Sequence, residues 1–382
     1  MQTGLEVFLA EGLPGLTGKR VGLITNHTGV DSRFRGTVDL LHDDERIELA
    51  ALFGPEHGVR GAAQAGVEVG GAVDERTGLP IHSLYGETRT PTAEMLAGLE
   101  VLVYDIQDPG VRYATYESTL FNAQQAAASV GLTVVVLDRP NPLTGSGVEG
   151  NVLDPAFTSF VGTHPLVTRH GLTVGELARL FAAERGWPEP VVVPLRGWRR
   201  AWWFDETGLP WVQPSPNMPT LDAATLYPGT CLIEGTTLSE GRGTTRPFEL
   251  IGAPWIDPFD LAAELERRNV PGVAFRPAYF TPIFSKHAHA SCGGVQVHIV
   301  DRGWMRPVEL GVHLLHAVRT LRPDQFAWRQ GGDGRYFVDL LFGSDRPRRA
   351  LDEGAAVSEV TMGWSEDARG FEERRRPFML YE

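Results

Sequence analysis

The feature that most constrains the fold is an alternation of short apolar runs and amphipathic stretches over the first 140 residues. Runs of strand length alternate with stretches of helical period, which predicts parallel βαβ units in a doubly wound sheet. We expect five strands, over 19–25, 47–53, 81–84, 101–106 and 133–137. We expect helices between them, over 37–42, 91–99 (with Thr90 as its N-cap) and 118–129.

With 382 residues, the chain is too long for one compact core, which predicts two domains. We expect an α/β domain with the doubly wound sheet over 1–150 and an α+β domain over 151–382. The segment 141–154 is rich in Gly, Pro and Asn and is the expected crossover. Further expected elements are helices over 173–184 (with a capping box) and 258–268, strands over 191–195 and 294–300, and an irregular aromatic-rich segment over 198–219.

Polar side chains follow all five expected strands of the first domain. Ligands of open parallel sheets bind in the crevice at the carboxyl ends of the strands. The sequence therefore predicts a site at this edge. The residues at the five ends are, in chain order, Asn26 and His27, Glu56 and His57, Tyr85, Asp105 and Asp108, and Arg139.

Charge and motif context exclude several classes of function. A net charge of −13 opposes binding to nucleic acid or insertion into anionic membranes. The G-x-G-x-x-G match at 145–150 has no strand directly before it and no helix opening on it, so it does not predict nucleotide binding. The chain has no G-x-S-x-G elbow, and its two cysteines, Cys231 and Cys292, are expected to be reduced and buried.

The histidines do not complete a metal site in the sequence. His287 and His289 share one face of an extended segment, with Cys292 close behind, but no further ligand pattern completes the set. We therefore expect these histidines to form hydrogen bonds and to bind no metal.

Carboxylates remain as the candidates for chemistry. Glu56 lies at a strand end between Pro55 and His57, a stiff setting for a general acid. Glycoside hydrolysis needs one carboxylic acid to protonate the leaving oxygen, and a second group that can be the substrate's own acetamido group. The glycine-rich stretch 241–246 adds Arg242 and Arg246, which can clamp a carboxylate.

Seven motifs occur in one order between residues 24 and 245, and together they resemble the exo-β-N-acetylmuramidase family, in a match that runs from about residue 18 to the C-terminus. The motifs are ITNHTG (24–29), GPEHGVRG (54–61), SLYG (83–86), YDIQD (104–108), DRPNP (138–142), PSPNMP (214–219) and SEGRGTT (239–245). The resemblance implies that the domain over 1–150 is Rossmann-like, that it is joined to a smaller auxiliary domain over 151–382, and that the active-site cleft lies between them. It also implies release of N-acetylmuramic acid from the non-reducing end of peptidoglycan fragments. It implies that Glu56 is the catalytic glutamate and that no cofactor is needed.

The resulting hypothesis assigns residues to two roles. The catalytic candidates are Glu56, His57, Asp105 and Glu240. Muramic acid carries a lactyl carboxylate, for which we expect Arg242 and Arg246 to supply the cation. The substrate-binding candidates are Asn26, His27, Arg60, Tyr85, Asp108, Arg112, Arg139, Asn217, Arg242 and Arg246.

Two alternatives stay open at the level of the sequence. One is a non-catalytic protein that binds cell-wall sugars in the same cleft. The other is a metal-dependent hydrolase centred on His57, His287 and Asp105.

The expected partner is a muramyl-containing saccharide, and the sequence leaves the oligomeric state open. Residues 1–6 lack the basic start and apolar stretch of a signal peptide, which predicts a cytoplasmic protein unless the natural chain begins earlier.

Overall fold

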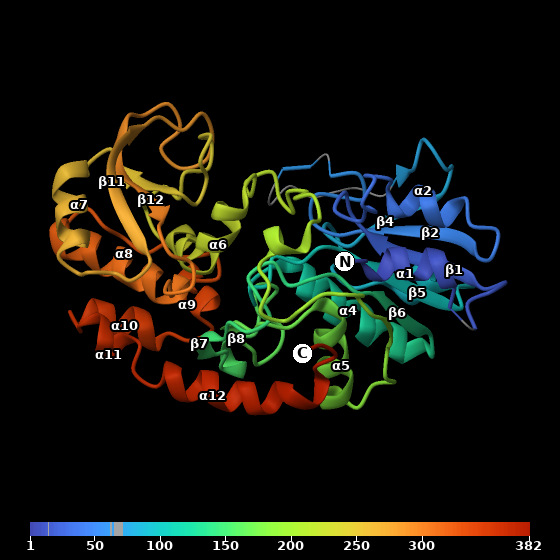
Figure 1. The fold of residues 1–382 in the computed structure, drawn as a ribbon. Helices are drawn as coiled ribbons and strands as arrows, with labels where there is room; N and C mark the ends of the chain where they lie inside the picture. The colour runs from blue at the N-terminus through green and yellow to red at the C-terminus, as the bar shows by residue number, and fades with distance from the viewer. Residues whose placement is uncertain (14, 62, 65–71) are drawn as a thin grey trace.

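A seven-stranded sheet organises the N-terminal part of the computed structural model, which describes residues 1–13, 15–61, 63–64 and 72–382 (Figure 1). The strand order is β3-β4-β2-β1-β5-β6-β9, and every neighbouring pair is parallel except β3 with β4. The predicted doubly wound parallel sheet is confirmed. The strands are β1 (Arg20–Thr25), β2 (Glu48–Gly54), β3 (Ala72–Val73), β4 (Pro80–Ser83), β5 (Val101–Asp105), β6 (Thr133–Leu137) and β9 (Val191–Val193).

Helices cover both faces of this sheet because its strands are apolar on both sides. In β1, Leu23 faces one core and Ile24 the other, as the period of two requires. One face packs against α1 and α2, and the other against α3, α4 and α5. Their bounds are α1 (Gly4–Glu11), α2 (Thr37–His42), α3 (Ala93–Leu96), α4 (Thr115–Val130) and α5 (Val174–Arg185).

Helix starts follow the expected chemistry, with one correction. The capping box of α5 is present, with the Thr173 hydroxyl accepting from the Glu176 N–H and the Glu176 carboxylate accepting from the Thr173 N–H. The predicted cap of α3 at Thr90 is wrong. Thr92 caps this helix instead, because its hydroxyl accepts from the Met95 N–H at 3.3 Å.

The C-terminal part is built around a three-stranded antiparallel sheet in the order β10-β12-β11. Helices α7 and α8 pack with this sheet in a separate apolar core. This arrangement confirms the α+β character expected beyond the first sheet. The elements are α6 (Leu221–Thr230), η3 (Cys231–Gly235), β10 (Leu250–Ala253), α7 (Pro258–Glu266), β11 (Val273–Phe280), β12 (Cys292–Ile299), α8 (Pro307–Leu321), α9 (Phe337–Phe342), α10 (Arg346–Asp352), α11 (Val357–Val360) and α12 (Trp364–Arg375).

The segment between the two sheets is long and crosses between them more than once. The expected crossover at 141–154 contains β7 (Glu149–Val152), which pairs with β8 (Val167–Arg169). The chain then places α5 against one face of the first sheet and adds β9 to the sheet as a strand. The first sheet therefore extends past the domain boundary expected at residue 150. Three short 3-10 turns complete the chain: η1 (Pro155–Phe157), η2 (Phe204–Thr207) and η4 (Arg376–Phe378).

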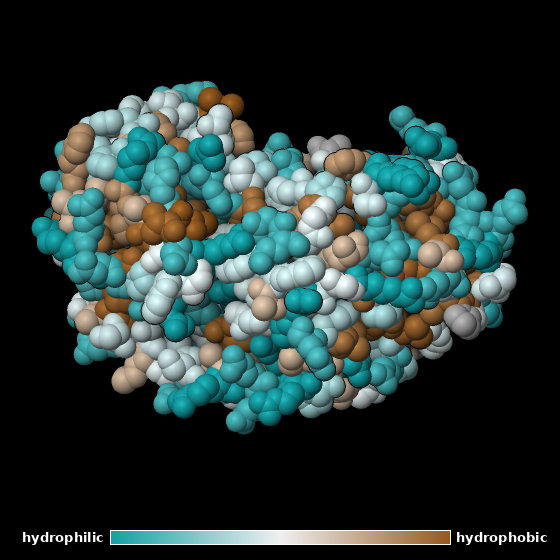
Figure 2. Space-filling model, viewed as in Figure 1, coloured by the Kyte–Doolittle hydropathy of each residue, from teal (hydrophilic) through white to brown (hydrophobic). Residues whose placement is uncertain are grey.

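The last helix returns the chain to its N-terminal part. Helix α12 runs along the bottom of the molecule in Figure 1, from the C-terminal sheet's side towards α5. Beyond it, the Leu380 N–H donates to the Glu176 carboxylate at 2.8 Å, and the Tyr381 hydroxyl donates to Asp138 at the end of β6. Polar side chains cover most of the face seen in Figure 2. In the described part of the chain, no helix is long and apolar enough to span a membrane.

Candidate active site

A cavity of about 770 Å³ is lined by residues from both parts of the chain. The N-terminal part contributes the loops that follow β2 and β4 and the start of α4. The later part of the chain contributes residues of α6, η3 and α9 and of the loops around 217, 240–242, 284–285 and 329–331. The polar lining residues include Glu56, Tyr85, Thr115, Asn217, Glu234, Glu240, Arg242 and Arg329.

A tight turn after β2 places Glu56 at this cavity. The Gly58 N–H donates to the Pro55 carbonyl at 2.9 Å, and His57 takes a left-handed backbone conformation with φ of 72°. Glu56 is half-buried, and its Oε2 accepts from the Thr115 hydroxyl at 2.7 Å. Because Thr115 is the first residue of α4, the contact joins the end of β2 to the start of that helix.

Two neighbours of Glu56 have shifted pKa values. Burial, together with the charge of Glu56, raises the pKa of Tyr85 to about 12, so its hydroxyl keeps its proton near neutrality. Burial lowers the pKa of His57, although the Glu56 charge acts in the opposite direction. The Nδ1 atom of His57 lies 2.8 Å from the Ala63 carbonyl. His57 therefore supports the loop beside Glu56 and does not line the main cavity.

An ion-paired cluster forms another part of the cavity wall. The guanidinium of Arg242 lies 2.9 Å from Glu234 Oε1 and 3.3 Å from Glu240 Oε1. Glu240 is buried, and its other oxygen lies 2.7 Å from Lys286 Nζ. Burial opposes the charge of Arg242, but the two glutamates outweigh that effect and raise its pKa. Arg242 and Glu240, both candidates from the sequence, line the same cavity as Glu56.

Aromatic side chains line a smaller space next to Glu56. A pocket of about 70 Å³ shares Glu56, Thr115 and Arg242 with the main cavity and extends to Tyr116 and Met218. Tyr113 and Tyr227 line both spaces, with their rings edge to face at 5.6 Å. Such apolar walls next to carboxylates suit a sugar ring and its acetamido methyl group.

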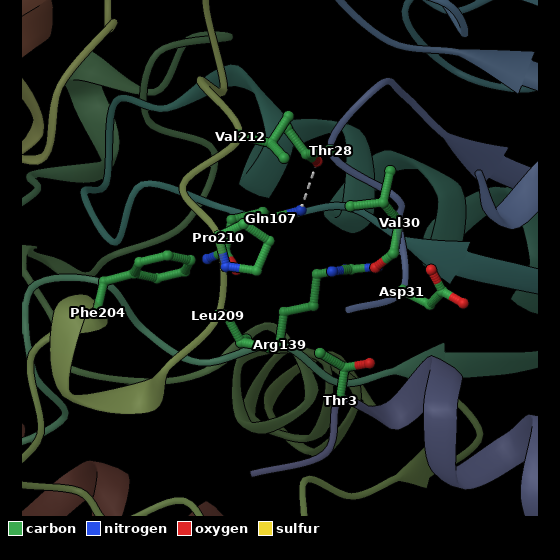
Figure 3. A pocket seen from close by; sticks show the side chains of 10 residues that line it. All are labelled: Thr3, Thr28, Val30, Asp31, Gln107, Arg139, Phe204, Leu209, Pro210 and Val212. Atoms are coloured by element: carbon green, nitrogen blue, oxygen red, sulfur yellow. Dashed lines mark hydrogen bonds between the residues drawn. The ribbon is translucent and has the colours of Figure 1, made fainter. Parts of the chain in front are cut away.

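The ends of β1, β5 and β6 do not reach this cavity. Asp105 is fully buried and pairs with Arg139, and it also accepts from the Thr37 hydroxyl. The segment 204–213 covers these strand ends. Its side chains lie beside Gln107 and Arg139 around a space of only about 20 Å³, enough for one water molecule (Figure 3). Asp105 and Arg139, predicted at a site, are instead a buried ion pair.

Other predicted substrate-binding residues also have protein partners outside the cavity. The fully buried Arg112 donates to four backbone carbonyls, and burial lowers its pKa to about 10. Arg60 pairs with Asp74 and Asp39. The exposed Arg246 lies 3.3 Å from Glu249. A ring nitrogen of His27 lies 2.7 Å from the Gln213 carbonyl, and Asn26 Oδ1 accepts from the Thr28 N–H at 2.9 Å.

The residues expected in a metal site are engaged separately. His287 Nε2 lies 2.7 Å from the Thr237 carbonyl, whereas Asp105 pairs with Arg139. In the described residues, three potential ligands do come together: Asp108, Glu117 and His170, all buried.

The hydrogen bonds of His170 argue against metal binding at this cluster. His170 Nδ1 accepts from the Leu172 N–H at 3.1 Å, which leaves the ring proton on Nε2, 2.7 Å from Glu117. Nε2 therefore presents an N–H and no lone pair. Burial, followed by the charge of Glu117, raises the pKa of Asp108 well above its ordinary value. These features fit a carboxyl group of Asp108 that keeps its proton beside Glu117 better than they fit a bound cation.

Several lining residues were not predicted from the sequence. Thr115 precedes the expected helix start at residue 118. Its place at the N-terminus of a helix is the signal that could have indicated a position at the site. Glu234, on η3, is one of several carboxylates in turn-like, glycine-rich settings of the sequence, and nothing there selects it over a solvated carboxylate. Arg329 reaches the cavity through long-range packing of the loop that precedes α9.

Carboxyl groups around an open cavity with aromatic walls, on an α/β scaffold, define the general plan of a glycoside hydrolase. Comparison with known families sharpens this class. The N-terminal domain of exo-β-N-acetylmuramidase NamZ matches residues 21–222, and the C-terminal domain matches residues 225–381. The chain belongs to this family.

Individual relatives cover the whole chain. A Bacillus subtilis protein named peptidoglycan β-N-acetylmuramidase NamZ is 45% identical over 382 residues, which are 100% of this chain and 91% of the relative. Two crystal structures of DUF1343 family proteins from Bacteroides fragilis are similar over 100% of this chain and 99% of theirs. Their TM-scores are 0.92 and 0.79, at 39% and 30% identity.

Proposed function

We propose that this protein is an exo-acting β-N-acetylmuramidase that hydrolyses muramyl-containing peptidoglycan fragments, with Glu56 as the general acid. The observation that carries the proposal is the position of Glu56 at the cavity, held by the Thr115 hydroxyl. The name and the 45% identity of the Bacillus subtilis relative support the choice of substrate. Because residues from both parts of the chain line the 770 Å³ cavity, we propose it as the expected active-site cleft.

The geometry supplies the two parts of a glycosidase reaction. Glu56 donates a proton to the glycosidic oxygen as the bond to the anomeric carbon breaks. The ring then carries positive charge, which the carboxylates of Glu234 and Glu240 stabilise across the cavity. Because Arg242 holds both of these carboxylates, the substrate's own acetamido oxygen is the better candidate to bond to the anomeric carbon as the protonated leaving oxygen departs. Water then opens this intermediate at the anomeric carbon, and Glu56 takes back a proton from that water.

Turnover of a chromogenic β-N-acetylmuramide, measured with and without a chelator, tests the proposal. We expect hydrolysis at the same rate in both conditions. Binding of N-acetylmuramic acid without any turnover would favour a sugar-binding protein. Loss of turnover with the chelator, restored by added metal, would favour the metal-dependent alternative.

A further inference from the structure

The cavity contains a cationic group that no carboxylate of the described chain neutralises. Of its described lining residues, Arg242 and Arg329 carry permanent positive charge. Arg242 is paired with both Glu234 and Glu240, and Lys286 behind them is paired with Glu240. Among the described residues, no Asp or Glu forms an ion pair with Arg329.

The backbone around Arg329 is held in place although its side chain is exposed. The Arg329 N–H donates to the Gly235 carbonyl at 2.8 Å, and the Arg329 carbonyl accepts from the Phe337 N–H at 3.0 Å. The guanidinium Nη1 donates to the Glu234 carbonyl at 3.2 Å. This single bond to a neutral oxygen leaves other N–H groups of the guanidinium available to a ligand, since arginine has five.

The charge of the cavity favours an anionic ligand in the reactive state. Arg242, Lys286 and Arg329 are matched in number by Glu56, Glu234 and Glu240. A general acid must be protonated before it acts, so Glu56 is neutral in the state that binds a reactive substrate. The group then carries one excess positive charge, which one carboxylate of a substrate would balance.

We propose that Arg329 binds the carboxylate of the lactyl ether of N-acetylmuramic acid and so determines specificity for muramyl over other N-acetyl sugars. This inference rests on the proposed function and identifies the substrate group that the cavity recognises. It replaces the expectation that Arg242 and Arg246 bind this group. Arg246 does not line the cavity and pairs with Glu249, and the charge of Arg242 is neutralised by two glutamates.

Calorimetric binding of N-acetylmuramic acid and of its lactyl methyl ester tests the proposal without requiring turnover. The two ligands differ only in the charged group. We expect the wild-type protein to bind the acid about 10- to 100-fold more tightly than the ester, as hydrogen bonds to a charged group predict. Arg329→Gln should bring this ratio close to one, and Arg329→Lys should restore part of it.

A matched control is Arg335→Gln, since Arg335 is exposed, pairs with Asp333 and does not line the cavity. This variant should keep the wild-type ratio. An unchanged ratio in Arg329→Gln, or loss of the ratio in Arg242→Gln alone, would overturn the proposal. A wild-type protein that prefers the acid but never hydrolyses a muramide would instead contradict the proposed function and leave the binding role of Arg329 supported.

Discussion

The polar residues at the carboxyl edge of the first sheet are buried in one half of the edge and line an open cavity in the other half. At β1, β5 and β6 the polar groups are buried beneath the segment 204–213, where Asp105 pairs with Arg139. At β2 and β4 the strand ends carry Glu56 and Tyr85, which line an open cavity. The same local pattern, a polar group after a buried strand, therefore produces a structural network in one half and a candidate active site in the other.

The difference depends on what the rest of the chain places over each half. The inner strand ends meet an aromatic-rich segment that leaves a space of about 20 Å³. The outer ends face η3 and its neighbouring loops across about 770 Å³. Topology brings polar residues to one edge, but the covering segments determine which of them can contact a ligand.

The largest effect should come from changing the acid of the outer half. Glu56→Gln keeps the size of the side chain and removes its proton, so we expect turnover of a β-N-acetylmuramide to fall about 10²- to 10⁴-fold. The melting temperature should change little, because Glu56 is only half-buried. Glu87→Gln, an exposed change nearby, is the control and should keep full activity. Full activity in a folded Glu56→Gln variant would remove Glu56 from the role of acid.

Asp105→Asn tests the inner half. The variant leaves the buried Arg139 guanidinium without its carboxylate, so we expect the free energy of unfolding to fall by about 3–5 kcal/mol. Urea denaturation measures the loss. Glu100→Gln, which removes the exposed pair with Lys19, should cost about 1 kcal/mol or less. If Asp105→Asn lost activity at unchanged stability, the inner half would belong to the chemistry after all.

The pH dependence of stability provides a further test of the inner half. Burial raises the pKa of Asp138, at the end of β6, to about 7, despite hydrogen bonds from Tyr381 and Gly175. The unfolded value is about 4, so between pH 4 and 7 the folded chain holds a proton that the unfolded chain has lost. Raising the pH across this window therefore lowers the free energy of unfolding, by at most about 1.4 kcal/mol per pH unit for one group.

The measurement compares wild type with Asp138→Asn in urea at pH 5, 6 and 7. Taking the difference between the two proteins cancels the histidines, which titrate in both. We expect the stability advantage of the wild type to shrink as the pH rises. The buried Glu149, whose pKa burial also raises to about 7, provides the matched variant Glu149→Gln with the same sign. A difference that stays constant with pH would show that Asp138 is already charged in the folded protein.

The smallest effect should come from Thr115→Val, which removes the hydroxyl that holds Glu56. One hydrogen bond is worth about 1 kcal/mol, so we expect a decrease in kcat of about fivefold to tenfold at similar stability. Thr115→Ser keeps the hydroxyl and should recover most of the rate. Equal losses in the Val and Ser variants would show that the methyl group matters and the hydrogen bond to Glu56 does not.

Much of the fold could be predicted because its signals are local. The apolar runs of β1, β5 and β6, and the capping box at Thr173 and Glu176, depend only on neighbouring residues. The extension of the first sheet to β9 could not be read in this way, since 191–193 joins β6 across the intervening α5. The predicted strands have nearly the observed lengths, but β10 and β11 were not predicted, and the membership of a strand in one sheet or another depends on long-range packing.

The residues of the site also differ in whether a local signal in the sequence could predict them. Glu56 could be predicted from its strand end and its motif, and Arg242 and Glu240 from a glycine-rich loop. The sequence could not predict that Glu56 lines the cavity whereas Asp105 is buried in an ion pair, because both residues lie at the ends of buried strands of one sheet. Arg329 reaches the cavity through backbone pairing with Gly235, almost a hundred residues away, and no pattern in the sequence marks that contact.

The contact between the C-terminal residues and the first sheet also determines how late one hydrogen bond of Asp138 can form during synthesis. Asp138 leaves the ribosome early, yet its partner Tyr381 is made 243 residues later. At about 5–20 residues per second, the carboxyl group waits about 12 to 50 s for that hydroxyl. The strands of the first sheet are all made by residue 193, but a chain that stalls before residue 381 leaves the carboxyl group of Asp138, at the end of β6, without this hydroxyl.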